Sequence, residues 1–340
     1  MPQPKPKKIV YLFGAGATHA ELSVLENTIL EEKEGLLMKS VSARVIDQAR
    51  RKKNYVKGIE MVSSTKGSLN IELLISLIEN SKVEGWEFKS QILKTLVKKD
   101  IQTILNKKSR IKKFYLHKAL FELHKKKIVR SKEKLIGIIS LNYDDVLDRA
   151  YKEYYGEPNY CFSLEKDTSV ANKIPLLKLH GSFNWNKKKI RGRKRTIEII
   201  PLGASKNYLH APYNFIWSRA MEILIECDTL RVIGCSLSQN DIHLIDLLFK
   251  AHVEKGHPFL IEIISSTETG EGIQKNYGIF PEIKTLTEIG SPKAGYKNEV
   301  PLVGGDPNPN NAFHTWIKYK VDSMLKKKVK KTKYVKLLTQ

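Results

Sequence analysis

The stretch IVYLFGAGAT, residues 9–18, joins a continuously apolar run to a glycine-rich turn. Such a run is typical of a parallel strand that is buried on both faces. Glycine at 14 and 16 lets the backbone turn tightly and approach a phosphate, whose charge meets the N-terminal amides of the following helix. The alternative is a purely structural turn, because the complete GxGxxG spacing and a clear acidic partner for a ribose are absent. The candidate phosphate-binding residues are Gly14, Ala15, Gly16, Ala17 and Thr18.

Four more short apolar runs have strand character, and helical patterns lie between some of them. The runs span residues 135–141, 176–179, 230–234 and 259–264. Strand–helix alternation favours the α/β class, with a Rossmann-like doubly wound parallel sheet. Residues 20–134 lack strong strand runs, so we expect a large helical insertion or subdomain there, within a single domain of residues 1–340.

Two helices are predicted from apolar residues that recur on one face. The face of the first helix consists of Ile71, Leu74, Ile75 and Ile78. The face of the second consists of Ile242, Ile245, Phe249 and Val253, and Gly256 is its expected stop. Residues 183–215 read as a basic loop with one possible strand at 196–201, residues 290–311 as a loop, and residues 312–340 as a basic C-terminal helix and tail.

The composition limits the class of protein. The chain has 340 residues, of which 41% are hydrophobic, so it can form a substantial core. No apolar stretch approaches the ~20 residues of a membrane span, and no secretory signal is recognisable at the N-terminus. Three scattered cysteines without a CxxC pair argue against a disulfide framework and a structural zinc site, and favour a reducing cytoplasm.

The formal net charge of +23 is large and is spread over several lysine-rich clusters. One interpretation is attraction to a polyanion such as nucleic acid, or to an acidic partner. The other is a set of solvated charged faces, which suits most of the clusters because they contain few aromatic residues. The cluster at 187–195, with three arginines, is the best exception.

Polar side chains follow the second apolar run, in SLNYDDVLD at 140–148. An amide at Asn142 and a carboxylate at Asp144 suit a hydroxyl-rich ligand such as a ribose, at the strand end where open α/β sheets bind their ligands. The alternative is a helix cap, and we assign capping to Asp145.

Two more strand ends carry candidate residues. His180, in KLHGSFNW at 178–185, is followed by a glycine that allows close approach, which shifts it from a structural towards a catalytic role. In VIGCSLSQND at 232–241, Gly234 and Ser236 could meet a ribose or phosphate, although Ser238 or Asn240 could instead open a helix. Ser265, after the last apolar run, is a further candidate by position alone. Four loops would thus converge on one edge of one sheet, which predicts a nucleotide-binding α/β enzyme.

Taken in order, GAGAT, LNYDD, KLHGS and GCSLSQND resemble four motifs of the sirtuin-type (SIR2-like) family, over roughly residues 8–265. NIELLISLIE at 70–79 is similar to a helix of its prokaryotic branch. Deacylating sirtuins carry a four-cysteine zinc module, a GIPxFR-type segment and a glutamine where Leu141 stands here. These departures argue against a protein deacylase.

The resemblance implies a SIR2-like effector of bacterial anti-phage defence, acting by abortive infection. Such an enzyme hydrolyses NAD⁺ and needs no zinc. Asn142 would orient the attacking water or a ribose hydroxyl, His180 would act on a ribose hydroxyl as general base, and Asp144 would hold the nicotinamide ribose or stabilise the cationic transition state.

A free NADase would kill its host, so the resemblance also implies gating by a partner, a ligand or an assembly state. Some relatives pair with a HerA-like ATPase, and a homo-oligomer is expected, with residues 20–134 as candidate assembly contacts. The alternative to an enzyme is a catalytically silent SIR2-like module that binds a nucleotide or a nucleic acid.

Overall fold

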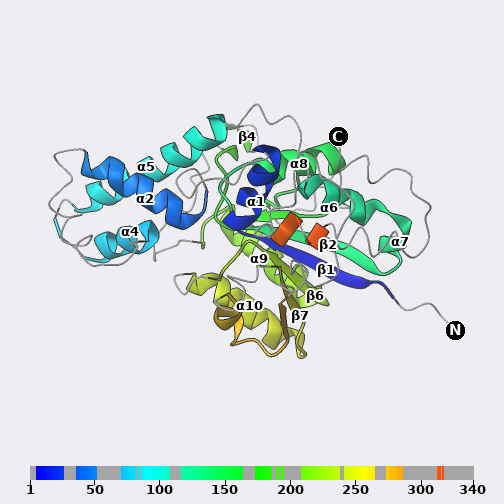
Figure 1. The fold of residues 1–340 in the computed structure, drawn as a ribbon. Coiled ribbons are helices and arrows are strands. Elements are labelled where there is room, and N and C mark those ends of the chain that lie inside the picture. The colour runs from blue at the N-terminus through cyan, green and yellow to red at the C-terminus, as the bar shows by residue number, and fades with distance from the viewer. Residues whose placement is uncertain are drawn as a thin grey trace.

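The structure is a computed structural model of the 340-residue chain (Figure 1). It describes most of the sheet and of the helices around it. The described residues are 5–26, 36–51, 70–81, 83–84, 86–107, 116–163, 173–185, 189–190, 193–194, 208–237, 241–264, 273–285, 312–314 and 316–317.

Six strands form one sheet in the order β3-β2-β1-β6-β7-β8, and every neighbouring pair is parallel. Numbered along the chain, these six strands run 3-2-1-4-5-6 across the sheet, which is the order of Rossmann folds. The strands are β1 (Lys7–Phe13), β2 (Glu133–Ser140), β3 (Leu176–Lys178), β6 (Thr229–Ile233), β7 (Leu260–Ile264) and β8 (Ile283–Thr285).

The predicted parallel sheet is confirmed, and all five predicted strands are present. In β1 every residue from Ile9 to Phe13 is buried, which explains why the strand is continuously apolar. β8 was not predicted, because this three-residue edge strand has the sequence IKT and carries no apolar run. The possible strand at 196–201 and the loop at 290–311 lie outside the described residues. A separate antiparallel pair, β4 (Lys189–Ile190) and β5 (Arg193–Lys194), lies within the basic cluster at 187–195.

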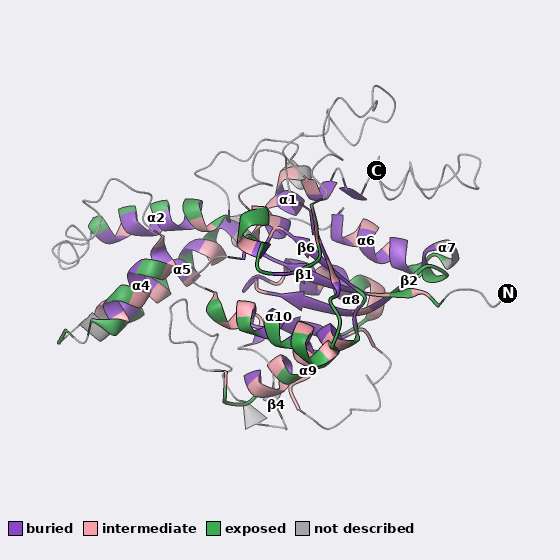
Figure 2. Ribbon diagram, turned by 90° about the horizontal axis from the view of Figure 1, so that it is seen from below, coloured by how far each residue is buried: buried purple, intermediate pink, exposed green. Residues whose placement is uncertain are grey.

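Helices cover both faces of the sheet (Figure 1). α1 (Ala15–Glu26), α6 (Leu116–Lys125), α7 (Lys127–Arg130) and α8 (Val146–Tyr155) lie on one side, and α9 (Tyr213–Glu226) and α10 (Ile242–Lys255) on the other. The residues turned towards the sheet are buried, as Figure 2 shows. Of the predicted C-terminal helix, only residues 312–314 and 316–317 are described, and Phe313 and Trp316 are buried in the main core.

Three helices stand to one side of the sheet and have a core of their own (Figures 1 and 2). They are α2 (Met38–Arg50), α4 (Ile71–Asn80) and α5 (Trp86–Lys107). The predicted apolar face of α4 is confirmed, since its four residues are all buried. Asn70 caps this helix by accepting a hydrogen bond from the amide of Glu72 at 2.8 Å. We call α2, α4 and α5 the helical cluster.

The predicted apolar face of α10 is wrong. The helix buries its other apolar residues, Leu244, Leu247, Leu248 and Ala251, against the main core. Three of the four residues assigned to the core, at 242, 249 and 253, are exposed. Apolar residues occupy two faces of this helix, so periodicity alone could not select the one that packs. The predicted stop is confirmed, because Gly256 ends α10 in a left-handed conformation.

Candidate functional site

The carboxyl ends of four neighbouring strands carry the predicted site residues. β1 ends before Gly14, β2 before Asn142, β3 before His180, and β6 before Gly234. The chain moves outward from β1 through β2 and β3, then restarts on the other side of β1 at β6. Open parallel sheets bind ligands in the crevice at such a reversal of strand order. The structure therefore brings these loops to the one edge of the sheet that the sequence predicts.

The glycines at this edge allow two loops to touch. The amide of Gly16 donates to the carbonyl of Gly234 at 3.0 Å, and the amide of Ala17 donates to the carbonyl of Gly14 at 3.0 Å. A Cβ at Gly14 would lie 2.4 Å from the carbonyl oxygen of Gly234, whose own φ is +63°. Two amides of the first turn of α1 are thus used inside the fold. The pyrophosphate role of residues 14–18 stays a prediction.

Asn142 ties the end of β2 to the start of α1. Its Nδ2 donates to the carbonyl of Gly14 at 2.9 Å and to Oγ1 of Thr18 at 3.0 Å. Because a carbonyl only accepts, the Gly14 contact fixes which end of the amide is nitrogen. Both amide hydrogens are engaged, so Asn142 can meet a ligand only through Oδ1, as a hydrogen-bond acceptor.

Asp144 is buried and holds two elements together. Its Oδ2 accepts from Thr18 Oγ1 at 3.0 Å, and its Oδ1 accepts from the amide of Val146 at 3.0 Å. Burial raises the pKa of the Asp144 carboxyl, while the Lys178 ammonium and the two hydrogen bonds oppose that shift. A buried carboxylate with a perturbed pKa is typical of a functional site.

The capping role assigned to Asp145 is wrong. Asp145 occupies the N-cap position of α8, but its side chain makes no cap hydrogen bond. It pairs instead with Nη2 of Arg149 at 3.1 Å, one helical turn further on. Asp144, one residue earlier, reaches the first amide of the helix. Asp144 is buried and its Oδ1 accepts from the amide of Val146, whereas the Asp145 side chain is partly exposed and turns to Arg149.

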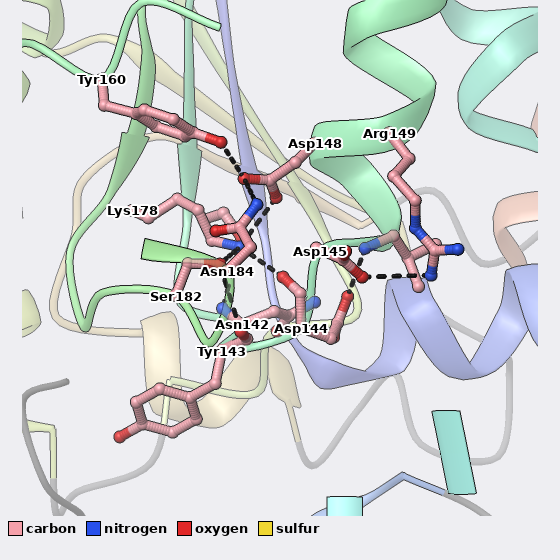
Figure 3. A network of polar contacts seen from close by, with 12 residues as sticks. Asn142, Tyr143, Asp144, Asp145, Asp148, Arg149, Tyr160, Lys178, Ser182 and Asn184 are labelled. Carbon is pink, nitrogen blue, oxygen red and sulfur yellow. Dashed lines mark hydrogen bonds and ion pairs between the residues drawn. The ribbon is translucent and has the colours of Figure 1, made fainter. Parts of the chain in front are cut away.

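A fully buried lysine, Lys178, connects the loop after β2 to the loop after β3 (Figure 3). Nζ of Lys178 donates to Oδ2 of Asp148 at 2.8 Å, to Oγ of Ser182 at 2.7 Å, and to the backbone carbonyl of Asp144. Asp148 also accepts from the hydroxyl of Tyr160. An ammonium group without exposure needs such a set of acceptors. This buried pair therefore fixes the loop after β2 against the loop after β3.

His180 lies beside a second carboxylate. Its Nε2 is 3.6 Å from Oδ1 of Asp241, and both side chains are largely buried. Asp241 occupies the N-cap position of α10, yet its side chain makes no cap hydrogen bond and instead lies near the imidazole. A carboxylate in this position stabilises the imidazolium form of a histidine.

Tyr143 forms an aromatic wall beside His180. Its ring stacks on Phe183 at 5.7 Å between centroids and lies 6.1 Å from the imidazole. Burial raises the pKa of the Tyr143 hydroxyl well above its usual value, and the carboxylates of Glu72 and Asp241 add to the rise. Tyr143 and Phe183 both pack in the core of the helical cluster. The helical cluster thus borders the site.

Of the three predicted serines, only Ser236 lies among the described residues. Ser236 is exposed in the loop after β6, where its backbone carbonyl accepts from Nδ2 of Asn276 at 2.8 Å. Ser265 and Ser238 lie outside the described residues. A ligand role for Gly234 and Ser236 stays a prediction.

Three site residues were missed from the sequence, namely Lys178, Asp148 and Asp241. A lysine within the apolar run LLKL was a usable signal, because a charged residue in a strand buried on both faces requires a partner. Asp148 and Asp241 carry no comparable signal. Each lies near the start of a helix, where acidic residues are common.

The cysteines are not candidates for nucleophilic chemistry. Burial raises the pKa of the Cys161 and Cys235 thiols to about 11 and that of Cys227 to about 12, so little thiolate forms near neutral pH. Among the described residues, no group of three or more histidine, cysteine or acidic side chains could hold a metal ion. None of the described helices is long and apolar enough to cross a membrane.

The chain was compared with known protein families, curated proteins and solved structures. The family model of the SIR2-like domain matches residues 136–279, which contain β2, β3, β6, β7 and the loops with Asn142 and His180. No curated protein matches the sequence. Solved structures that resemble the chain include one from work on the mechanism and regulation of Sir2 enzymes, which is 14% identical, with 95% of each chain covered and a TM-score of 0.34. They also include a Sir2 homolog in complex with NAD, which is 12% identical, with 94% of this chain and 91% of that chain covered and a TM-score of 0.35. Residues 136–279 are thus the part of the chain that matches the family model of the SIR2-like domain.

Proposed function

We propose that the protein is an NAD⁺ hydrolase that cleaves the bond between nicotinamide and ribose. The observation that carries this proposal is the position of Asn142, Asp144 and His180 at the strand ends where a parallel sheet of this order receives a dinucleotide. The SIR2-like match over 136–279 includes all three residues. One of the similar solved structures is described as an NAD complex.

The reaction consumes one water. Its oxygen bonds to the anomeric carbon as the bond from that carbon to the nicotinamide nitrogen breaks. The products are nicotinamide, ADP-ribose and a proton. Positive charge develops on the ribose ring in the transition state, so carboxylates and acceptor oxygens nearby would stabilise it.

Each residue has a role that its contacts allow. Asn142 would accept a hydrogen bond from the water or a ribose hydroxyl through Oδ1, because its amide hydrogens are engaged in the fold. His180 would take up the released proton, assisted by the carboxylate of Asp241 at 3.6 Å. The buried carboxylate of Asp144 would stabilise the positive ribose. The pyrophosphate would lie over the start of α1, with Gly234 and Ser236 across from it.

The biological role follows from the same proposal. An enzyme that destroys NAD⁺ fits abortive infection in anti-phage defence, and it must be held inactive until needed. Activation by assembly into an oligomer, by a HerA-like ATPase or by another activator would provide this control. The basic surface offers a second route, through nucleic acid, and we place the enzyme in the cytoplasm.

The test is nicotinamide release from NAD⁺ by the purified full chain, beside Asn142→Ala, His180→Ala and His180→Gln. We expect turnover that each substitution lowers by about 10²–10⁴-fold, the usual contribution of a group in such a role. The matched control is Asp145→Asn, which alters a neighbouring, partly exposed carboxylate that pairs with Arg149. Circular dichroism and thermal melts would establish that all variants fold.

Calorimetric titration of NAD⁺ on the same samples separates the remaining outcomes. Binding without turnover would describe a gated enzyme without its activator, and turnover should then appear when an activator is supplied. A chain that neither binds nor cleaves NAD⁺ contradicts the proposal. Salt-sensitive binding of nucleic acid by such a chain would favour the silent binding module.

A further inference from the structure

The outer face of α10 carries an apolar stripe that the fold does not use. Ile242, Phe249 and Val253 are 58%, 55% and 61% exposed, and Ile245 lies partly buried between them. Their successive spacings of three, four and four residues keep all four on one side of the helix. Exposed stretches of α10 are green in Figure 2. We call these four residues the α10 stripe.

The stripe is not a by-product of packing. α10 meets the main core through a different set of apolar residues, and it also packs beside α9. The other large exposed apolar residues in the described part of the chain do not form a run of this length on one helix. Contiguous apolar surface of this kind marks a contact site on soluble proteins. Its spacing is that of a seam between two packed helices.

The local charge favours one occupant. The chain carries a formal charge of +23, so two copies repel one another over most of their surfaces. α10 is an exception, because its two acidic residues, Asp246 and Glu254, balance its two basic residues, Lys250 and Lys255. A neutral face is where two strongly basic copies can approach at the lowest electrostatic cost.

The charges beside the stripe are also self-complementary. Asp246 and Lys250 form an ion pair at 2.7 Å along the edge of the stripe. If two copies of α10 pack antiparallel about a two-fold axis near residue 248, Asp246 of each copy faces Lys250 of the other. The same axis places the Ile242 end of the stripe in one copy opposite the Val253 end in the other copy. A two-fold contact requires this kind of surface, which complements itself.

We propose that α10 is a self-association surface, on which a second copy of this chain packs its own α10 antiparallel along the stripe. This surface lies outside residues 20–134, where the sequence suggested assembly contacts. The proposal does not depend on the chemistry at the strand ends.

The test is the mass of the purified full chain in solution, by light scattering and sedimentation equilibrium at micromolar concentration. We expect a dimer or a larger even-numbered assembly. Phe249→Glu should raise the dissociation constant of the α10 contact by at least about tenfold, since it places a charge at the centre of the seam. The matched control is Leu77→Glu, a similarly exposed leucine on α4 in the helical cluster, which should leave the mass unchanged.

A charge swap tests the antiparallel arrangement. Lys250→Asp should weaken association, because each copy then presents two acidic residues at the axis. The double substitution Lys250→Asp with Asp246→Lys should restore it. A monomeric wild-type chain, or an assembly that Phe249→Glu leaves intact, overturns the proposal. In either case a different protein becomes the candidate partner for the stripe. Thermal melts of each variant would identify any loss of mass that results from unfolding.

Discussion

Replacing Asp241 by asparagine would test how the site activates His180. The substitution keeps the size of the side chain and removes its charge. At 3.6 Å, two unit charges attract by about 4 to 5 kcal/mol when the effective dielectric constant is about 20. The distance exceeds that of a hydrogen bond and Asp241 is 15% exposed. We therefore expect the carboxylate to stabilise the imidazolium of His180 by only about 1.5 to 2.5 kcal/mol. At 1.36 kcal/mol per factor of ten, kcat should fall about 10- to 70-fold.

The assay is kcat for nicotinamide release as a function of pH. A base must be neutral to accept a proton, and the Asp241 carboxylate stabilises its charged form. Removal of that charge should therefore move the acid limb of the profile to lower pH while the plateau falls. Asp241→Glu should recover part of the activity. The control is Asp47→Asn, which removes an exposed carboxylate on α2 that pairs with Arg51.

Two results would refute this reasoning. In the first, Asp241→Asn leaves both kcat and the acid limb unchanged. In the second, kcat falls and the acid limb stays in place, which would indicate a structural role at the start of α10. If the wild type shows no turnover, NMR titration of the His180 ring still measures the contact, with His180→Gln identifying the signal.

Three further predictions concern stability and pH. Gly234→Ala should lower the melting temperature strongly, because its Cβ would lie 2.1 Å from a backbone nitrogen. Gly256→Ala is also at positive φ but has open space around it, so it should lower the free energy of unfolding by only about 1–2 kcal/mol. Lys178→Met should cost about 3–5 kcal/mol in chemical denaturation, since it leaves Asp148 buried without its partner, and adding Asp148→Asn should recover part of that loss. Asp144→Asn should raise the free energy of unfolding at neutral pH, because burial raises the pKa of this carboxyl and disfavours its charged form. The gain in stability should fade as the pH falls through that pKa. A gain in stability that does not depend on pH would contradict this account.

The sequence predicted the parts of this fold that depend on local patterns. β1, β2, β3, β6 and β7 were found because parallel strands buried on both faces are continuously apolar. The packing face of α4 was found because four apolar residues are regularly spaced on it, whereas the leucines outside this face, Leu73 and Leu77, are fewer and stay exposed. The face of α10 was wrong because both faces are apolar and only the packing partner decides between them.

The sequence predicted where the site residues lie, but it did not predict which side chains they contact. Strand ends placed Asn142, Asp144 and His180 at one edge of the sheet, because parallel strands end together there. The partners of these residues could not be read from the sequence. Asp241 is 61 positions from His180 along the chain, and only the crossing of the strands brings them together. The same holds for Thr18, whose hydroxyl bridges Asn142 and Asp144.

The packing of Tyr143 limits which segments of this chain could be replaced by the matching segment of a similar protein. Asn142 and Asp144, on either side of it, are hydrogen-bonded to the start of α1. The ring of Tyr143 itself packs in the core of the helical cluster. A chimera that replaces the segment from 36 to 107 would leave this ring without its packing partners and would loosen the strand end that holds Asn142. The helical cluster is therefore not expected to behave as a detachable module. A successful graft would have to carry residue 143, and the stacked ring at 183, together with the helices that they pack against.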